Sequence, residues 1–171
     1  MSLDGFIAGP DDEMSWIFDY MAPDAFPDIA AATGAMLIGR RTYEVGKRQR
    51  DADEVGGKEY GGGWSGPVFV LTHRPPEPLD SAVTFLTGDI EEAVATARIA
   101  AGSKNLEILG ADVACQCLRR GLVDEILVYV IPVLLGDGIR FSCPGIARMD
   151  LEPISSTQSG AVTILRFRVR G

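Results

Sequence analysis

Short runs of branched apolar residues alternate with helix-forming segments along most of this chain. The runs occupy residues 6–8, 36–38, 68–71, 83–86, 106–109 and 126–131, and helix-forming composition fills residues 90–101 and 113–120. Strands that are joined by crossover helices run parallel, with right-handed connections. The alternation therefore predicts an α/β fold with a largely parallel sheet.

The C-terminal run has a different pattern. Between residues 165 and 170, three apolar residues alternate with three arginines. A period of two is typical of a strand that has one face in water. We expect this strand to be antiparallel and to lie close to a sheet edge.

Length and charge limit the classes of partner. The 171 residues suit one domain with a full core, and we expect a single domain over residues 1–171. No apolar run reaches the roughly 18 to 20 residues of a membrane span, and Met1–Asp4 lack the basic start of a signal peptide. We therefore expect a cytoplasmic protein without a membrane partner. The net charge of −8 disfavours nucleic acid as a partner.

The segment from Ala35 to Glu44 brings a glycine and two arginines to a predicted helix start. An apolar run ends at Gly39, and Arg40 and Arg41 follow. A helix start offers unpaired N–H groups and a partial positive charge, and arginine binds phosphate oxygens in a bidentate manner. The segment is interpreted as an anion site, and the alternative is a solvated helix start with surface arginines.

Two further segments are candidates for nucleotide binding. Gly110–Val113 follow a strand and open a helix, where the backbone N–H groups suit an anion, although Asp112 is also a possible cap of that helix. Thr72–Arg74 end another strand and suit a ribose with its phosphate. His73 is the only histidine, and we assign it to binding rather than to proton transfer.

A glycine-rich segment interrupts the alternation. Residues 56–66 hold six glycines together with Lys58, Tyr60 and Trp64. The segment is not a P-loop, because Glu59 follows Lys58 where a P-loop has Ser or Thr. Two interpretations stay open: a flap beside a ligand, with Trp64 as a stacking surface for substrate, or a surface connection.

No metal site is expected. Cys115 and Cys117 lie two residues apart on a predicted helix and therefore on different faces, and Cys143 is remote in sequence. The chain also lacks the H-x-E and P-C-x-x-C motifs of zinc deaminases, which excludes deamination.

Five motifs, in order, carry a resemblance to a known family. They are SLDGFIAGP at residues 2–10, LIGRRTYE at 37–44, VFVLTHRP at 68–75, ILGADVACQCLRRGLVDEI at 108–126 and VIPVLLGDGIRF at 130–141. The chain resembles the dihydrofolate-reductase-like superfamily, and within it the C-terminal reductase domain of bacterial bifunctional deaminase-reductases of riboflavin synthesis, as a stand-alone member. The resemblance implies a three-layer α/β/α fold with a mostly parallel mixed sheet and an antiparallel C-terminal strand.

The resemblance also implies an NADPH-dependent oxidoreductase that assembles as a homodimer. The cofactor phosphates would be contacted by Gly39, Arg40, Arg41 and Thr42, and the adenosine ribose by Thr72, His73 and Arg74. The pyrophosphate would be contacted by Gly110, Ala111, Asp112 and Val113, and the nicotinamide would lie near Ile7 and Ala8. The turn at the far side of the cofactor would be formed by Gly136, Asp137 and Gly138. Arg40 or Arg41 would select the 2′-phosphate of NADPH. At the substrate end, the resemblance implies Asp4, with Trp16 and Asp19 as further candidates.

The expected reaction is direct hydride transfer to a carbonyl or iminium carbon of a small heterocyclic or sugar-like substrate, with the proton supplied by water or by Asp4. Asp4 has an alternative role, because Asp-Gly is a common turn pair whose carboxylate bonds local backbone. A substrate such as 5-amino-6-(5-phosphoribosylamino)uracil would need further cations for its phosphate, and Lys58, Arg140 and Arg148 are the candidates.

Two other functions stay open. A dihydrofolate reductase-like activity on a pterin would need an inward-facing carboxylate, for which Asp19 and Asp24 are candidates. A non-catalytic nucleotide-binding dimer is the other alternative. It is favoured by Leu109, where many relatives carry a second glycine, and by the small number of residues ahead of the SLDG motif.

Overall fold

The computed structural model describes residues 1–20, 26–52 and 58–170. By its internal contacts the chain divides into two compact units, one formed by residues 1–22 with 118–171 and the other by residues 23–117. Each unit is described by itself. Among the described residues, no helix has the length and apolar character needed to cross a membrane.

The unit of residues 23–117 is built on a four-stranded parallel sheet. Its strands lie in the order β4-β3-β2-β5, with bounds β2 Thr33–Gly39, β3 Val68–Leu71, β4 Thr84–Leu86 and β5 Asn105–Leu109. The apolar runs of β2 and β3 are buried, with Leu37 and Val70 fully inaccessible, whereas those of β4 and β5 are only partly buried. The prediction of a largely parallel sheet is confirmed.

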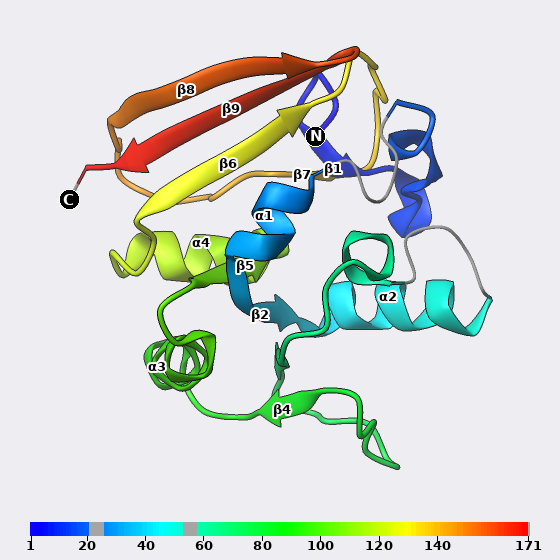
Figure 1. Cartoon of the computed structure of the whole chain (residues 1–171), viewed down its shortest axis with the longest axis vertical. Helices are drawn as coiled ribbons and strands as arrows, with labels where there is room; N and C mark the ends of the chain where they lie inside the picture. Colours follow the sequence, from blue (N-terminus) through cyan, green and yellow to red (C-terminus); the bar gives the residue numbers. More distant parts are fainter. Residues whose placement is uncertain (21–25, 53–57, 171) are drawn as a thin grey trace. The chain divides into compact units, whose positions relative to one another are not determined.

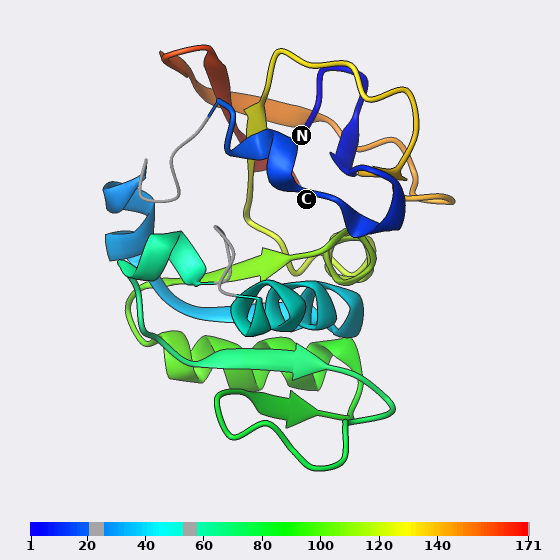
Figure 2. The ribbon, with the colours of Figure 1, turned by 90° about the vertical axis from the view of Figure 1, so that its right-hand side faces the viewer.

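Helices cover both faces of this sheet. The helices are α1 Pro27–Ala32, α2 Arg40–Asp51, α3 Ile90–Ala101 and α4 Ala111–Arg119, with a 3-10 turn at Glu59–Gly62. Figures 1 and 2 show α2 and α3 on opposite sides of the strands, so the unit is a helix–sheet–helix sandwich. This arrangement confirms the predicted three-layer α/β/α architecture.

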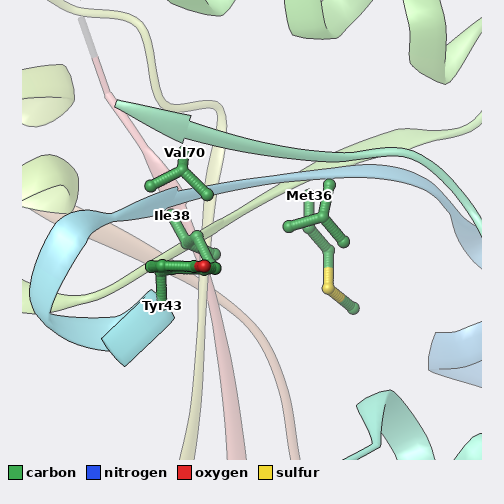
Figure 3. Close-up of a cluster of buried hydrophobic side chains, with 5 residues drawn as sticks. Met36, Ile38, Tyr43 and Val70 are labelled. Atoms are coloured by element: carbon green, nitrogen blue, oxygen red, sulfur yellow. The ribbon is translucent and has the colours of Figure 1, made fainter. Parts of the chain in front are cut away.

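One buried cluster packs the start of α2 against the central strands. Met36, Ile38 and Val70 form a buried cluster with Tyr43, which reaches them from the first turn of α2 (Figure 3). The ring of Tyr43 meets that of Phe85 edge to face, with centroids 5.3 Å apart. The cluster fixes the start of α2 against the carboxyl half of the sheet.

Helix α3 has a small-residue face. Asp89 caps its start by accepting hydrogen bonds from the N–H groups of Glu91 and Glu92. Its buried residues are Ile90, Ala93, Ala97 and Ala101. Ala101 lies so close to Gly34 that a Cβ on this glycine would come 2.3 Å from the Ala101 carbonyl oxygen. Small residues therefore let α3 pack tightly on β2.

The unit formed by the two ends of the chain is antiparallel. Its strands β6 Glu125–Val130, β9 Val162–Val169 and β8 Leu151–Ser159 form one sheet in the order β6-β9-β8, and β1 Phe6–Ala8 pairs with β7 Ile139–Arg140. Two 3-10 turns, Pro10–Asp12 and Ser15–Ile17, follow β1. The antiparallel C-terminal strand is confirmed.

The place of β9 in its sheet corrects one expectation. β9 is the central strand, with β6 and β8 on its two sides, and not a strand close to an edge. Its arginines form ion pairs on both sides: Arg166 contacts Glu125 on β6, and Arg168 lies 3.8 Å from Glu152 on β8. The alternation correctly indicated that one face of β9 is exposed to water. An exposed face does not make a strand an edge strand, because the backbone of β9 is paired on both sides.

Candidate functional site

The carboxyl ends of β2 and β5 form an edge that we call the glycine edge, because Gly39 ends β2 and Gly110 follows β5. Ile38 pairs with Leu109 in the parallel register, so the two glycines follow side by side. The chain leaves β2 toward β3 on one side, whereas β5 lies on the other side of β2. Open α/β sheets bind ligands outside the carboxyl ends of their strands at such a reversal of strand order.

Position 110 requires glycine, both because of its backbone conformation and because of the atoms around it. Its φ is +94°, a region that residues with side chains rarely adopt. A Cβ at this position would lie 2.6 Å from Oγ1 of Thr42. Gly39 is similarly close to Val113, whose Cγ2 would lie 3.1 Å from a Cβ at position 39. The structure thus brings together Gly39–Thr42 and Gly110–Val113, the two segments that the resemblance assigns to the phosphates of the cofactor.

Two helices start at the glycine edge. α2 begins at Arg40, and its N-cap Gly39 supplies no side-chain hydrogen bond. α4 begins at Ala111, and the N–H of Ala114 donates to the carbonyl of Gly110. The N–H groups of a first helical turn have no partner within the helix. The exposed Asp112 accepts a hydrogen bond at 2.8 Å from the side chain of Gln116.

Arg40 connects α2 with the end of β3. Its Nε donates to Glu44 at 2.6 Å, and its Nη1 donates to the carbonyl of Arg74 at 3.1 Å. Thr72 is buried and its Oγ1 accepts the N–H of Arg74, whereas His73 and Arg74 are exposed. The predicted ribose segment Thr72–Arg74 therefore lies beside the predicted phosphate segment, with its hydroxyl already engaged in the turn.

In the other unit, Asp4 organises the turn that carries the SLDG motif. Its carboxylate accepts hydrogen bonds from the Ser2 hydroxyl at 2.6 Å, from the Gly136 N–H at 2.8 Å and from the Leu135 N–H at 3.2 Å. The Ser2 bond, followed by the two backbone N–H groups, lowers the pKa of Asp4 to about 2. The guanidinium of Arg140 donates to the Asp4 carbonyl at 2.6 Å and lies 4.1 Å from the ring centroid of Phe6.

The residues predicted for the nicotinamide end lie together in this unit. Ala8 pairs with Ile139 in the short β1–β7 ladder. A Cβ on Gly138 would come 2.3 Å from the carbonyl oxygen of Ala8, so this close approach needs glycine. Gly136, Asp137 and Gly138 thus lie against the strand that holds Ile7 and Ala8, and Asp4 joins them through the N–H of Gly136.

The remaining substrate candidates do not gather at one site within the described residues. Trp16 is a core residue that packs with Ile131 and Val162 and donates to the carbonyl of Glu13. Asp19 is exposed, and Asp24 lies outside the described residues. Trp64 lies at the amino end of β2, where its Nε1 donates to the Thr33 carbonyl, so it does not lie at the glycine edge.

A partly buried carboxylate was missed by the sequence analysis. Oε2 of Glu107 accepts hydrogen bonds from the Tyr60 hydroxyl at 2.7 Å and from the Thr33 hydroxyl at 3.3 Å. Burial raises the pKa of Glu107, against the effect of these two bonds. The signal in the sequence was a single charge inside the apolar run from Leu106 to Leu109.

The comparison with protein families decides the identity of the fold. The family model described as the RibD C-terminal domain matches residues 1–165. The chain belongs to the RibD C-terminal domain family.

Relatives of this RibD C-terminal domain protein include two Bacillus subtilis (strain 168) proteins. The uncharacterized protein YwjB is 28% identical over 141 residues, which cover 81% of this chain and 76% of that protein. The uncharacterized protein YyaP is 27% identical over 174 residues, which cover 96% of this chain and 89% of that protein.

Solved structures support the fold. A putative riboflavin biosynthesis protein from Shewanella sp. PV-4 superposes with a TM-score of 0.80 at 22% identity, covering 100% of this chain and 96% of that one. A diaminohydroxyphosphoribosylaminopyrimidine deaminase/5-amino-6-(5-phosphoribosylamino)uracil reductase from Thermotoga maritima has a TM-score of 0.64 at 16% identity, covering 99% of this chain and 54% of that one. The dihydrofolate-reductase-like resemblance is borne out as a fold.

Proposed function

We propose that this RibD C-terminal domain protein is an NADPH-dependent reductase that transfers hydride to a small heterocyclic or sugar-like substrate. The observation that carries the proposal is the glycine edge. There two glycines let two helix starts lie close together, at the reversal of strand order where dinucleotides bind in α/β folds. The relatives that carry the name of a uracil reductase suggest a substrate of the 5-amino-6-(5-phosphoribosylamino)uracil class.

The residues of the glycine edge fit the phosphates of a dinucleotide. The first N–H groups of α2 and α4 supply hydrogen-bond donors, and Gly39 and Gly110 permit the backbone to approach closely. Arg40 and Arg41 would hold the 2′-phosphate, because guanidinium groups form strong charge-assisted bonds with phosphate. NADPH, when bound, supplies the hydride.

The protein's own contribution is alignment and not proton transfer by Asp4. With a pKa of about 2, the Asp4 carboxylate is ionised at neutral pH and has no proton to donate. Its two oxygens hold the N–H groups of Leu135 and Gly136 and so position the turn beside Ala8. We assign the proton to water and assign Asp4 to positioning.

We also propose that the protein acts as a homodimer in the cytoplasm. Support for the dimer comes from β8, an edge strand of its sheet that exposes Leu151 and Ile154 by 38% and 39%. Edge strands offer unpaired backbone groups to a second chain.

Titration with NADPH and with NADH tests the function, followed by nicotinamide fluorescence and by melting temperature. We expect binding with preference for NADPH, and a loss of about tenfold or more in Gly110→Ala, because the new Cβ occupies the space next to Thr42. Gly160→Ala is the matched control, since φ is +57° there but nothing lies within 4 Å.

Equal losses in both variants would show that backbone strain, and not the space at the glycine edge, is responsible. Absence of binding by either nucleotide would overturn the proposed function. Oxidation of NADPH by 5-amino-6-(5-phosphoribosylamino)uracil, compared with oxidation by dihydrofolate, then distinguishes the two substrate classes.

A further inference from the structure

A pocket of about 710 Å³ opens in the unit of residues 23–117, at the end of the sheet opposite the glycine edge. Thr33 and Gly34, at its base, begin β2, whereas Gly39 ends the same strand. Seven strand residues span about 20 Å at roughly 3.3 Å each. The pocket is therefore separate from the proposed cofactor site, and its volume lies within the range of about 300–1,000 Å³ of small-molecule sites.

An indole held in a fixed position forms one wall of this pocket. Nε1 of Trp64 donates to the Thr33 carbonyl at 2.9 Å. The ring lies so close to Gly66 that a Cβ there would come 2.3 Å from Cζ2 of Trp64. Because a hydrogen bond and a close backbone contact hold the ring, its plane is set before a ligand arrives. A second aromatic ring pairs best with such an indole when it is stacked with an offset or lies edge to face.

The other walls are aromatic or small. Phe26 and Tyr60 line the pocket, and the Tyr60 hydroxyl is held by its bond to Glu107. Ala30 and Ala101 leave room where larger side chains would fill the space. The shape and lining suit a flat, apolar ring system.

The charge at the pocket is positive. Lys104 is the one charged residue in its lining, within the described parts of the chain, and in those parts its ammonium forms no ion pair. Next to it, Arg98 donates to the carbonyls of Gly102 and Lys104 at 3.1 and 2.7 Å and so fixes the turn that carries the lysine. The Glu107 carboxylate lies behind this lining, where it accepts hydrogen bonds from the hydroxyls of Tyr60 and Thr33 and where burial raises its pKa. The cation in the lining, beside an aromatic wall, therefore favours an anionic ligand.

We propose that this pocket is a second ligand site that binds a small planar aromatic carboxylate. The ring lies against Trp64 between Phe26 and Tyr60, and the carboxylate accepts a charge-assisted hydrogen bond from Lys104. The proposal does not depend on the reductase function, because it uses none of the residues at the glycine edge.

Isothermal titration calorimetry with indole-3-acetate and tryptamine tests the proposal, since the two probes share a ring and differ in the sign of their charge. We expect indole-3-acetate to bind at least about tenfold more tightly than tryptamine. The carboxylate of indole-3-acetate gains a charge-assisted hydrogen bond with Lys104, whereas the ammonium of tryptamine is repelled by it. Lys104→Glu should weaken indole-3-acetate by about tenfold or more, and Lys47→Glu, on the exposed side of α2, should leave its affinity unchanged.

Ala31→Trp provides an independent variant. Ala31 is exposed and lines the pocket, so a large side chain at this position fills it without disturbing the core. Loss of indole-3-acetate binding with an unchanged melting temperature is the expected result. Gly110→Ala should bind the probe as the wild type does, which separates this site from the cofactor site.

Four outcomes would overturn the proposal. They are no heat with indole-3-acetate, equal binding of tryptamine, undiminished binding by Ala31→Trp, and a change of sedimentation coefficient in Ala31→Trp without any probe binding by the wild type. The last outcome would assign the pocket to contact with a second copy of the chain.

Discussion

Asp4 accepts three hydrogen bonds, and these bonds determine the chemistry of its carboxylate. The donors are the Ser2 hydroxyl and the N–H groups of Leu135 and Gly136. All three bonds favour the charged form, so the pKa falls to about 2 from the ordinary value of 3.8. A carboxylate in this state stabilises the turn and binds no proton near neutral pH.

The linkage between this pKa and stability gives a testable pH dependence. Because the pKa is lowered in the folded protein, the contribution of Asp4 is fully present above about pH 4 and is lost as the pH falls through about 2. We expect Asp4→Asn to be less stable than the wild type at pH 7. The difference in urea midpoint should shrink as the pH falls from 5 to 3, because Asp4 of the unfolded wild type binds a proton there while Asp4 of the folded protein stays ionised, and Asn has no such group.

Asp150→Asn is the control for this measurement. Asp150 is exposed and pairs with Arg148 two residues away. Its effect on the urea midpoint should be small at every pH. A difference between wild type and Asp4→Asn that stays constant from pH 7 to pH 3 would contradict the role assigned to the Asp4 carboxylate.

The start of helix α2 is the element on which cofactor selection depends. Arg40 and Arg41 open the helix directly after the glycine edge. We expect Arg40→Ala/Arg41→Ala to weaken NADPH binding by at least about tenfold, since each charged hydrogen bond contributes about 1.5–3 kcal/mol. NADH, which lacks the 2′-phosphate, should bind nearly as it does to the wild type.

Fluorescence titration of both nucleotides checks this prediction. Lys47→Ala removes a cation from the same helix, where Lys47 pairs with Asp51 at an exposed site, and should change neither affinity. Equal losses for NADPH and NADH in the double variant would assign the arginines to the pyrophosphate or to the contact between Arg40 and the Arg74 carbonyl.

The elements differ in how far the sequence predicts them. β3 and α3 have the predicted bounds, because a continuous apolar run and a helix-forming segment behind Asp89 leave little choice. β8 was not predicted, since Leu151–Ser159 is largely polar and exposed and becomes a strand through its pairing with β9. The prediction that β9 lies close to a sheet edge was wrong, because alternation indicates which face of a strand is exposed to water and not which strands pair with it.

The site residues show the same division. Gly39 and Gly110 were each predicted to lie in a phosphate-binding segment, and the parallel pairing of β2 with β5 brings these two segments to one edge. The burial of Trp16 and the place of Trp64 at the opposite end of β2 follow from tertiary packing, which no local pattern encodes. The role of the Asp4 carboxylate depends on N–H groups more than 130 residues away in the chain.

For the whole molecule, the dimer is the property that sedimentation tests most directly. We expect a dimer at micromolar concentration and its weakening in Ile154→Lys, because a lysine on an exposed edge strand opposes pairing with another chain. Ile99→Lys on α3 is the matched control, at an isoleucine that is 83% exposed outside any sheet. A monomeric wild type would refute the dimer.

The composition of the first unit from both chain ends has a consequence for biosynthesis. Gly138 contacts the backbone of Ala8, and the Asp4 carboxylate holds the N–H of Gly136, which follows it by 132 positions in the chain. The contiguous segment 23–117 has all the strands of its sheet once it has left the ribosome. Residues 4–8 therefore lack these partners on the nascent chain until the whole segment 23–117 has been made, and they pair only after that segment can already form its sheet.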